Sequence, residues 1–104
     1  MIIYLIIALV FAILCNIYDA TMTEKGIAAG VAVEGNTWLI GPKPKAWQLY
    51  VRDIPIIFLA STLSFVGYFT HNPALFYAGL VGPIVAGVKH LQGGLEWRAL
   101  GIKW

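Results

Sequence analysis

The chain has 104 residues, of which 60% are hydrophobic and 12% are charged, and its formal net charge is +2 at pH 7. A soluble domain usually carries about 25% charged residues, and so short a chain has too little interior to remove this much apolar surface from water. The composition therefore excludes a soluble globule and a disordered tail, and its single cysteine excludes a scaffold of internal disulfides. It indicates an integral membrane protein.

Two long stretches, residues 1–18 and 54–88, carry no charged side chain. As a helix the first is about 27 Å long, roughly the thickness of a hydrocarbon core. The second would be about 52 Å long, which suits two spans joined by a turn at Thr70–Pro73, because asparagine and proline interrupt helices. The sequence predicts an all-α membrane protein with three transmembrane helices, at about residues 2–19, 54–70 and 73–90. The last two are expected to form an antiparallel hairpin.

This arrangement places all seven lysines and arginines on one side of the membrane. The positive-inside rule makes that side cytoplasmic, with the N-terminus outside and the C-terminus inside. Residues 1–104 are then a single membrane domain, with a cytoplasmic segment at 19–53 that includes interfacial pieces and a short amphipathic tail at 91–104. We expect a prokaryotic inner membrane or a virion membrane.

Polar residues appear toward the end of the first predicted span, at Asn16, Asp19 and Thr23. Spacings of three and four place them on one face of a helix. A carboxylate at such a depth is costly unless it is solvated or paired. Two interpretations stay open: a site for an ion, a proton or a lipid headgroup, and a helix-end carboxylate at the water boundary.

The residues that follow resemble a known pattern. Asp19–Thr23 and Gly30–Asn36 are similar to the motif D-A-x-x-T … G-x-x-x-E-x-N of a family of small, uncharacterised prokaryotic multi-span membrane proteins, although Thr37 stands where that family often has proline. The resemblance covers residues 16–36. It implies that Asp19 and Thr23 form one polar cluster with Glu34 and Asn36, and it implies no activity.

The segment between the first two spans is predicted in pieces. Residues 26–33 are apolar but too short to cross, so they continue the first helix, re-enter the membrane or lie at its surface. Ala46–Arg52 is predicted as a short interfacial turn, Asp53 as the N-cap of the second span and Pro55 as part of its first turn. The aromatic side chains of the segment between the first two spans are expected at the level of the lipid headgroups. They are Trp38, Trp47 and Tyr50.

Small residues recur at helical spacing in the two later spans, where they let helix backbones approach closely in lipid. Pro83 predicts either a kink or one loosened turn in the third span, and Gly93–Gly94 predicts its end. The tail at 91–104 is then expected on the cytoplasmic membrane face through Trp97, Arg98 and Trp104. Arg98 and its neighbours either contact anionic lipid or simply set the topology. The predicted packing residues are Ala60, Ser64, Ala78, Gly82 and Ala86.

His90 could join Asp19, Glu34 and Asn36 at the cytoplasmic boundary, a set that suits a divalent metal or acid–base chemistry. The chain has no His-x-x-x-His, no cysteine pair and no nucleophile elbow, so a solvated polar layer is the favoured interpretation. We therefore predict no catalytic residue, no metal ligand and no cofactor. Without a basic stripe, nucleic acid is not an expected partner.

Three functions remain open. The first is a structural or accessory multi-pass subunit that packs through small-residue helix faces, with the lipid bilayer, copies of itself or a larger cellular or viral membrane complex as partners. The second is a pore-forming lysis protein, because length, span number and orientation resemble those of three-span phage holins. The third is a small membrane enzyme or ion carrier that uses the boundary polar residues. The expectation is that the chain is not an enzyme.

Overall fold

A computed structural model describes residues 1–30, 41 and 43–104 of the chain. Of this part, 82% is helical and none is strand, so the all-α prediction is confirmed. The molecule is long and narrow, with extents of 49 × 25 × 16 Å. The helices of the described residues are α1 (Ile2–Ala28), α2 (Ala46–Ala60), α3 (Thr62–Phe69), α4 (Pro73–Gly79) and α5 (Val81–Ala99).

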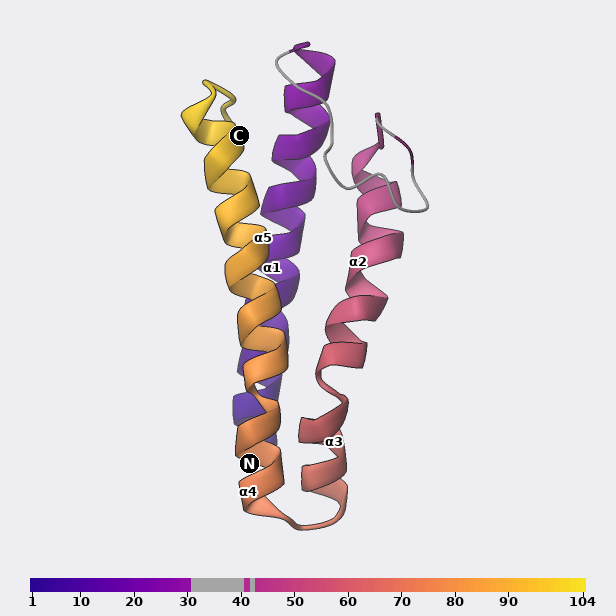
Figure 1. The fold of residues 1–104 in the computed structure, drawn as a ribbon, viewed down its shortest axis with the longest axis vertical. Coiled ribbons are helices and arrows are strands. Elements are labelled where there is room, and N and C mark those ends of the chain that lie inside the picture. The colour runs from indigo at the N-terminus through magenta and orange to yellow at the C-terminus, as the bar shows by residue number, and fades with distance from the viewer. Residues whose placement is uncertain (31–40, 42) are drawn as a thin grey trace.

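The helices form a bundle with three passes along its long axis (Figure 1). The first pass is α1, the second is α2 followed by α3, and the third is α4 followed by α5. The first and third passes run in the same direction and pack along much of their length, while the second runs against both. The N-terminus and the α3–α4 turn therefore lie at one end of the bundle, and the C-terminus lies at the other.

Two helical stretches are long and apolar enough to cross a membrane, Ile2–Ala28 and Pro73–Ala99. The pair α2 and α3 reaches the same standard only when taken together, and it is bent by 43° at the break between the two helices. By length and composition, the described residues thus provide two membrane-crossing helices, or three when the bent pair is a single span.

The first helix is longer than the predicted span of residues 2–19. It continues to Ala28, which makes it about 40 Å long. Asp19 and Thr23 consequently lie within a continuous helix that runs beyond the predicted end of the span. The interpretation of Asp19 as a carboxylate at the water boundary stays a prediction. Of the apolar segment at 26–33, Gly26–Ala28 continues this helix, and residues 31–33 lie outside the described part.

The second pass begins earlier than predicted, because α2 starts at Ala46. The predicted interfacial turn at residues 46–52 is helical, and Asp53 is a buried mid-helix residue, so its assignment as an N-cap is wrong. Other groups cap the helix: the Lys45 N–H donates to Oε1 of Gln48 at 2.8 Å, and the Glu24 carboxylate accepts from the Ala46 N–H. A carboxylate there satisfies a free backbone donor and complements the helix dipole.

Local chemistry explains both breaks within the later passes. At the first, the Ser61 hydroxyl donates to the Ile57 carbonyl at 2.8 Å, a back-bond that bends helices. At the second, the ring of Pro83 conflicts with the carbonyl of the residue four positions earlier, which is Gly79, and α4 ends at that residue. The helix is interrupted only at Leu80, and Pro73–Ala99 still forms one stretch of membrane-crossing length, so Pro83 coincides with one loosened turn.

The predicted turn at Thr70–Pro73 is confirmed, because α3 ends at Phe69 and α4 begins at Pro73. Asn72 caps α4 by accepting from the Leu75 N–H at 3.1 Å. His71 adopts a left-handed φ of 55°, and its N–H donates to the Tyr68 carbonyl at 3.3 Å. The Asn72 N–H reaches back to Gly67 at 2.8 Å, which completes a Schellman motif with histidine in the position that glycine usually fills.

The predicted helix end at Gly93–Gly94 is wrong, because α5 continues to Ala99. These glycines serve close packing instead. A Cβ on Gly94 would meet the ring of Tyr18, and a Cβ on Gly93 would meet the Asp19 carboxylate. Residues 91–99 are therefore the last turns of α5 packed beside α1, rather than a separate tail.

The small residues of α4 and α5 pack along a slightly different row from the predicted one. Gly82 lies against the carbonyl of Ala60, and Ser64 donates its hydroxyl to the Phe76 carbonyl at 2.9 Å. Ala78 is exposed and Ala86 is half-buried. Three buried positions are each one residue further along the chain, at Gly79, Pro83 and Gly87, and Gly94 is buried as well.

Candidate functional site

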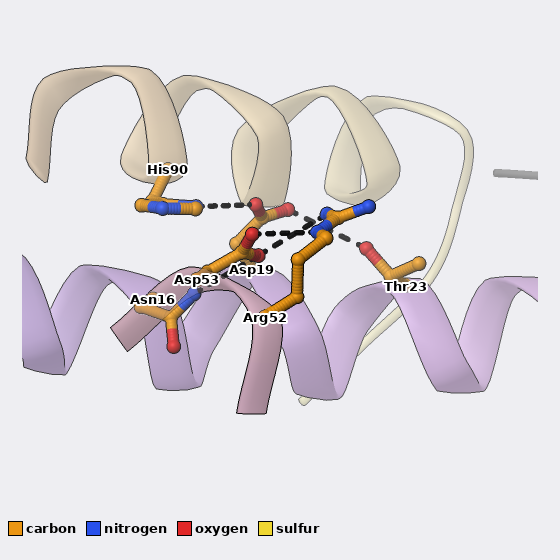
Figure 2. A network of polar contacts seen from close by, with 6 residues as sticks. All are labelled: Asn16, Asp19, Thr23, Arg52, Asp53 and His90. Carbon is orange, nitrogen blue, oxygen red and sulfur yellow. Dashed lines mark hydrogen bonds and ion pairs between the residues drawn. The ribbon is translucent and has the colours of Figure 1, made fainter. Parts of the chain in front are cut away.

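Charged and polar side chains from all three passes meet inside the bundle (Figure 2). The first pass contributes three of them, the second pass an adjacent basic and acidic pair, and the third pass a histidine. We call this group the polar cluster. Its members are Asn16, Asp19, Thr23, Arg52, Asp53 and His90.

The polar cluster lies at one level of the bundle. Asp19 is 17 residues beyond Ile2, and His90 is 17 residues beyond Pro73. Both are therefore about 25 Å from the end of the bundle that holds the α3–α4 turn. A hydrocarbon core is about 30 Å thick, so helices that cross it from that end carry the cluster close to the opposite boundary.

Arg52 and Asp53 form a forked ion pair although they are neighbours in sequence. Arg52 Nε lies 2.7 Å from Asp53 Oδ1, and Arg52 Nη2 lies 3.2 Å from Oδ2. The two side chains are only 7% and 10% exposed. The Asn16 amide adds a bond from α1, with Nδ2 donating to Asp53 Oδ2 at 3.4 Å. The carboxylate of Asp53 is thus satisfied by groups from two helices.

Asp19 and His90 form the second contact of the cluster, with Oδ2 and Nδ1 2.9 Å apart. The histidine side chain is 19% exposed and the aspartate 23%. Thr23, one turn later on α1, donates its hydroxyl to Asp19 Oδ1 at 3.4 Å. This side of the cluster is more exposed than the Arg52–Asp53 side and joins the first helix to the last.

A glycine makes the Asp19 contact sterically feasible. A Cβ at Gly93 would lie 2.7 Å from Asp19 Oδ1, which is closer than real Cβ atoms come to such an oxygen. Because Gly93 has no side chain, the α5 backbone passes directly over the carboxylate. Glycine is costly in a helix interior, and here the close approach of two helices compensates for that cost.

One buried acceptor of the cluster is not satisfied. Asn16 is fully buried, and within the part of the chain that the structure describes its Oδ1 has no hydrogen-bond partner. The amide nitrogen faces Asp53, while the oxygen points away from that carboxylate (Figure 2). A buried acceptor without a partner lowers the stability of a fold by about 1–3 kcal/mol. The contact from the Asn16 amide nitrogen to Asp53 offsets part of that cost.

The carboxylates of the polar cluster are engaged by basic side chains. Each carboxylate already faces a basic group, and the described residues contain no group of three or more His, Cys, Asp or Glu side chains arranged to hold a metal ion.

The structure brings four of the six predicted polar residues together, Asn16, Asp19, Thr23 and His90. Glu34 and Asn36 lie outside the described residues. Sequence reasoning missed Arg52 and Asp53. The spacing of the sequence could have indicated that Asp53 is buried. Leu49 and Ile57 lie four residues before and after it, so the three residues share one helix face, and all three are buried.

The aromatic residues assigned to the membrane interface have varied surroundings. Trp47 is 61% exposed. Tyr50 is half-buried, with its hydroxyl 3.4 Å from that of Thr21. Trp97 is half-buried against Gly26, and Arg98 is exposed on the same helix. Trp104 stacks on Tyr18, and Trp38 lies outside the described residues.

Fold and site together define an all-helical protein with two or three helices long and apolar enough to cross a membrane, and with an internal cluster of acidic and basic side chains. No family model matches the chain, and no curated protein or solved structure matches it.

Proposed function

We propose that the chain is a three-span membrane protein, with its N-terminus outside and its C-terminus in the cytoplasm, that acts as an accessory subunit of a larger membrane assembly. In this arrangement the bent pair α2–α3 is one span. The lysines and arginines near residues 43–52 and 89–103 then lie on the cytoplasmic side, in agreement with the positive-inside rule.

The observation that carries this proposal is the contrast between the inside and the outside of the bundle. The ionisable residues of the polar cluster contact one another in the interior. The outward faces expose large apolar side chains, including Leu14 on α1, Leu59 on α2 and Phe69 on α3. Such a molecule offers lipid and neighbouring helices an apolar surface, while the charged groups of the polar cluster contact one another inside the bundle.

One exposed patch is suited to another helix. Ala74 and Ala78 are exposed and four residues apart on α4, so they share a face that the bundle does not use. Small residues at this spacing permit close helix approach in lipid, where association depends on packing. A second copy of the chain or a helix of a larger partner fits such a face.

Native mass measurement after solubilisation in a mild detergent tests the proposal. We expect particles heavier than one chain, either homo-oligomers or complexes with a co-purifying partner, and we expect Ala78→Leu to reduce their share. Leu80→Ala, a change on the same pass at a half-buried position, serves as a control that should leave the share unchanged. Particles that are strictly monomeric would contradict the accessory role.

A second candidate function is a proton carrier, favoured by the 2.9 Å contact between Asp19 and His90 and by their partial exposure. Ionisable pairs inside membrane helices are common elements of proton pathways. Proton flux into liposomes, followed with an internal pH dye, tests it: the protein should raise the flux and Asp19→Asn should abolish the increase. Flux equal to that of empty liposomes would rule it out. The holin-like pore stays a prediction that loss of membrane potential on expression would support.

A further inference from the structure

A cavity of about 410 Å³ lies between α1 and the residues that follow α5. It is separate from the polar cluster and near the end of the bundle that holds the C-terminus. We call it the C-terminal pocket. Its lining residues are Tyr18, Met22, Arg98, Gly101, Ile102, Lys103 and Trp104.

A Schellman motif folds the chain back to form this pocket. The Gly101 N–H donates to the Arg98 carbonyl at 3.0 Å, and the Ile102 N–H donates to the Trp97 carbonyl at 3.2 Å. Gly101 has a φ of 94°, a left-handed conformation that glycine adopts without strain. Ile102 is 7% exposed and so anchors the reversed segment. The sequence Leu-Gly-Ile after α5 thereby directs the last residues toward α1.

Two contacts hold this segment against α1. The ring of Trp104 stacks on that of Tyr18, with centroids 5.6 Å apart and planes 17° apart. The Lys25 ammonium donates to the Lys103 carbonyl at 3.3 Å. Gly94 lets Tyr18 lie close to α5, which completes the wall between the two helices. The pocket is therefore built by defined contacts on both sides.

The pocket combines an apolar floor with a cationic rim. Met22 and Ile102 are buried in its lining, and Arg98 and Lys103 are exposed at its edge. No acidic side chain is among its described lining residues. Tyr18 directly precedes Asp19, so the pocket begins near the level of the polar cluster, and it extends toward the C-terminal end of the bundle, because Arg98 is eight residues, or about 12 Å, beyond His90 on α5. Tyrosine and tryptophan rings such as those of Tyr18 and Trp104 favour the headgroup region of a bilayer.

We propose that the C-terminal pocket binds the phosphate headgroup of an anionic phospholipid. Guanidinium groups bind phosphate oxygens through two parallel hydrogen bonds, and an ammonium group adds a second positive charge. Basic pockets between transmembrane helices at this depth favour anionic headgroups over zwitterionic ones. The apolar floor suits the glycerol and upper acyl carbons. The inference depends on insertion into a membrane and not on the accessory role.

Lipid adducts of the purified full chain provide the test. The chain is reconstituted in nanodiscs of phosphatidylcholine alone, or of phosphatidylcholine with phosphatidylglycerol, and the retained lipids are measured by native mass spectrometry. We expect phosphatidylglycerol adducts to predominate, and Arg98→Gln with Lys103→Gln to reduce their share about tenfold. The matched control, Lys43→Gln with Lys89→Gln, removes two exposed cations outside the pocket and should leave the share unchanged.

A further variant separates pocket shape from charge. Gly101→Ala keeps both cations and meets nothing within 4 Å, so it acts only by straining the reversed backbone. It should also lower the phosphatidylglycerol share. Three results would overturn the proposal. The pocket variants could retain as much phosphatidylglycerol as the wild type, or the control variant could lose as much phosphatidylglycerol as the pocket variant. Soluble glycerol phosphate could also bind equally well in nanodiscs without anionic lipid.

Discussion

Asp19 and His90 are 71 positions apart in the sequence, and their side chains meet at 2.9 Å in the interior of the bundle. The contact joins the first helix to the last. The amide of Asn16 reaches Asp53 on α2 from the same face of α1, so one face of the first helix holds both of its neighbours. In lipid, where the hydrophobic effect does not drive helices together, such polar contacts and close packing determine the arrangement.

Loss of the Asp19–His90 contact should weaken the bundle moderately. We expect Asp19→Asn and His90→Ala each to lower the free energy of unfolding by about 1 kcal/mol, because polar contacts between membrane helices are usually worth that much or less. The two substitutions together should cost less than the sum of the single costs. A double-mutant cycle, measured by unfolding in mixed micelles, checks the coupling. Strict additivity would mean that the two side chains do not act together.

The Arg52–Asp53 pair should respond more strongly because it is nearly buried. Asp53→Leu leaves a cationic side chain in the interior and should destabilise the fold by about 3 kcal/mol or more. Replacing both residues with leucine should cost less than Asp53→Leu alone. Thermal unfolding followed by circular dichroism provides the comparison, with Lys43→Leu as an exposed control. A double variant less stable than Asp53→Leu would contradict the pairing.

Close approach of α3 and α4 depends on Gly79, because a Cβ there would collide with the backbone of Ser64. Gly79→Ala should therefore destabilise the bundle by about 2 kcal/mol, although alanine is the better helix former. Ala78→Leu, at the exposed neighbouring position, should change stability by less than about 0.5 kcal/mol. Thermal unfolding measures both, and the reverse order of the two effects would show that the helices pack through the other face.

The turn at His71 carries backbone strain that glycine would remove. Its φ is 55°, which non-glycine residues adopt at a cost. We expect His71→Gly to raise the free energy of unfolding by about 0.5–1 kcal/mol. At Thr70, where φ is −95°, the same substitution should have no stabilising effect, which makes Thr70→Gly a matched control. Destabilisation by His71→Gly would indicate that the imidazole makes a contact of its own.

Much of the fold follows from local features of the sequence. The uncharged stretches predict membrane-length helices, and the Asn72–Pro73 pair predicts the turn, because an N-cap and a first-turn proline act on their own neighbours. Pro83 likewise predicts a break, since its ring conflicts with a carbonyl one turn earlier. These signals do not depend on what the rest of the chain does.

The packing faces and two of the six residues of the candidate site could not be predicted in the same way. In a membrane helix nearly every face is apolar, so polarity does not show which small residue meets a neighbour, and the predicted row with Ala78 differs by one position from the observed row with Gly79. Two adjacent glycines predict a helix end as long as the helix that packs on Gly93–Gly94 is not known. The charge of Asp53 predicts a helix boundary, whereas its contacts with Arg52 and Asn16 allow the carboxylate to be buried.

Cysteine accessibility tests the three-span account most directly, because the 43° bend between α2 and α3 also suits a re-entrant loop. Single cysteines replace Lys43, Asn72 and Lys103 in a Cys15→Ala background, and intact cells are treated with an impermeant thiol reagent. Three spans with the N-terminus outside predict labelling of Asn72→Cys from outside, and labelling of Lys43→Cys and Lys103→Cys only after permeabilisation. Labelling of Lys103→Cys in intact cells, with Asn72→Cys protected, would contradict the account.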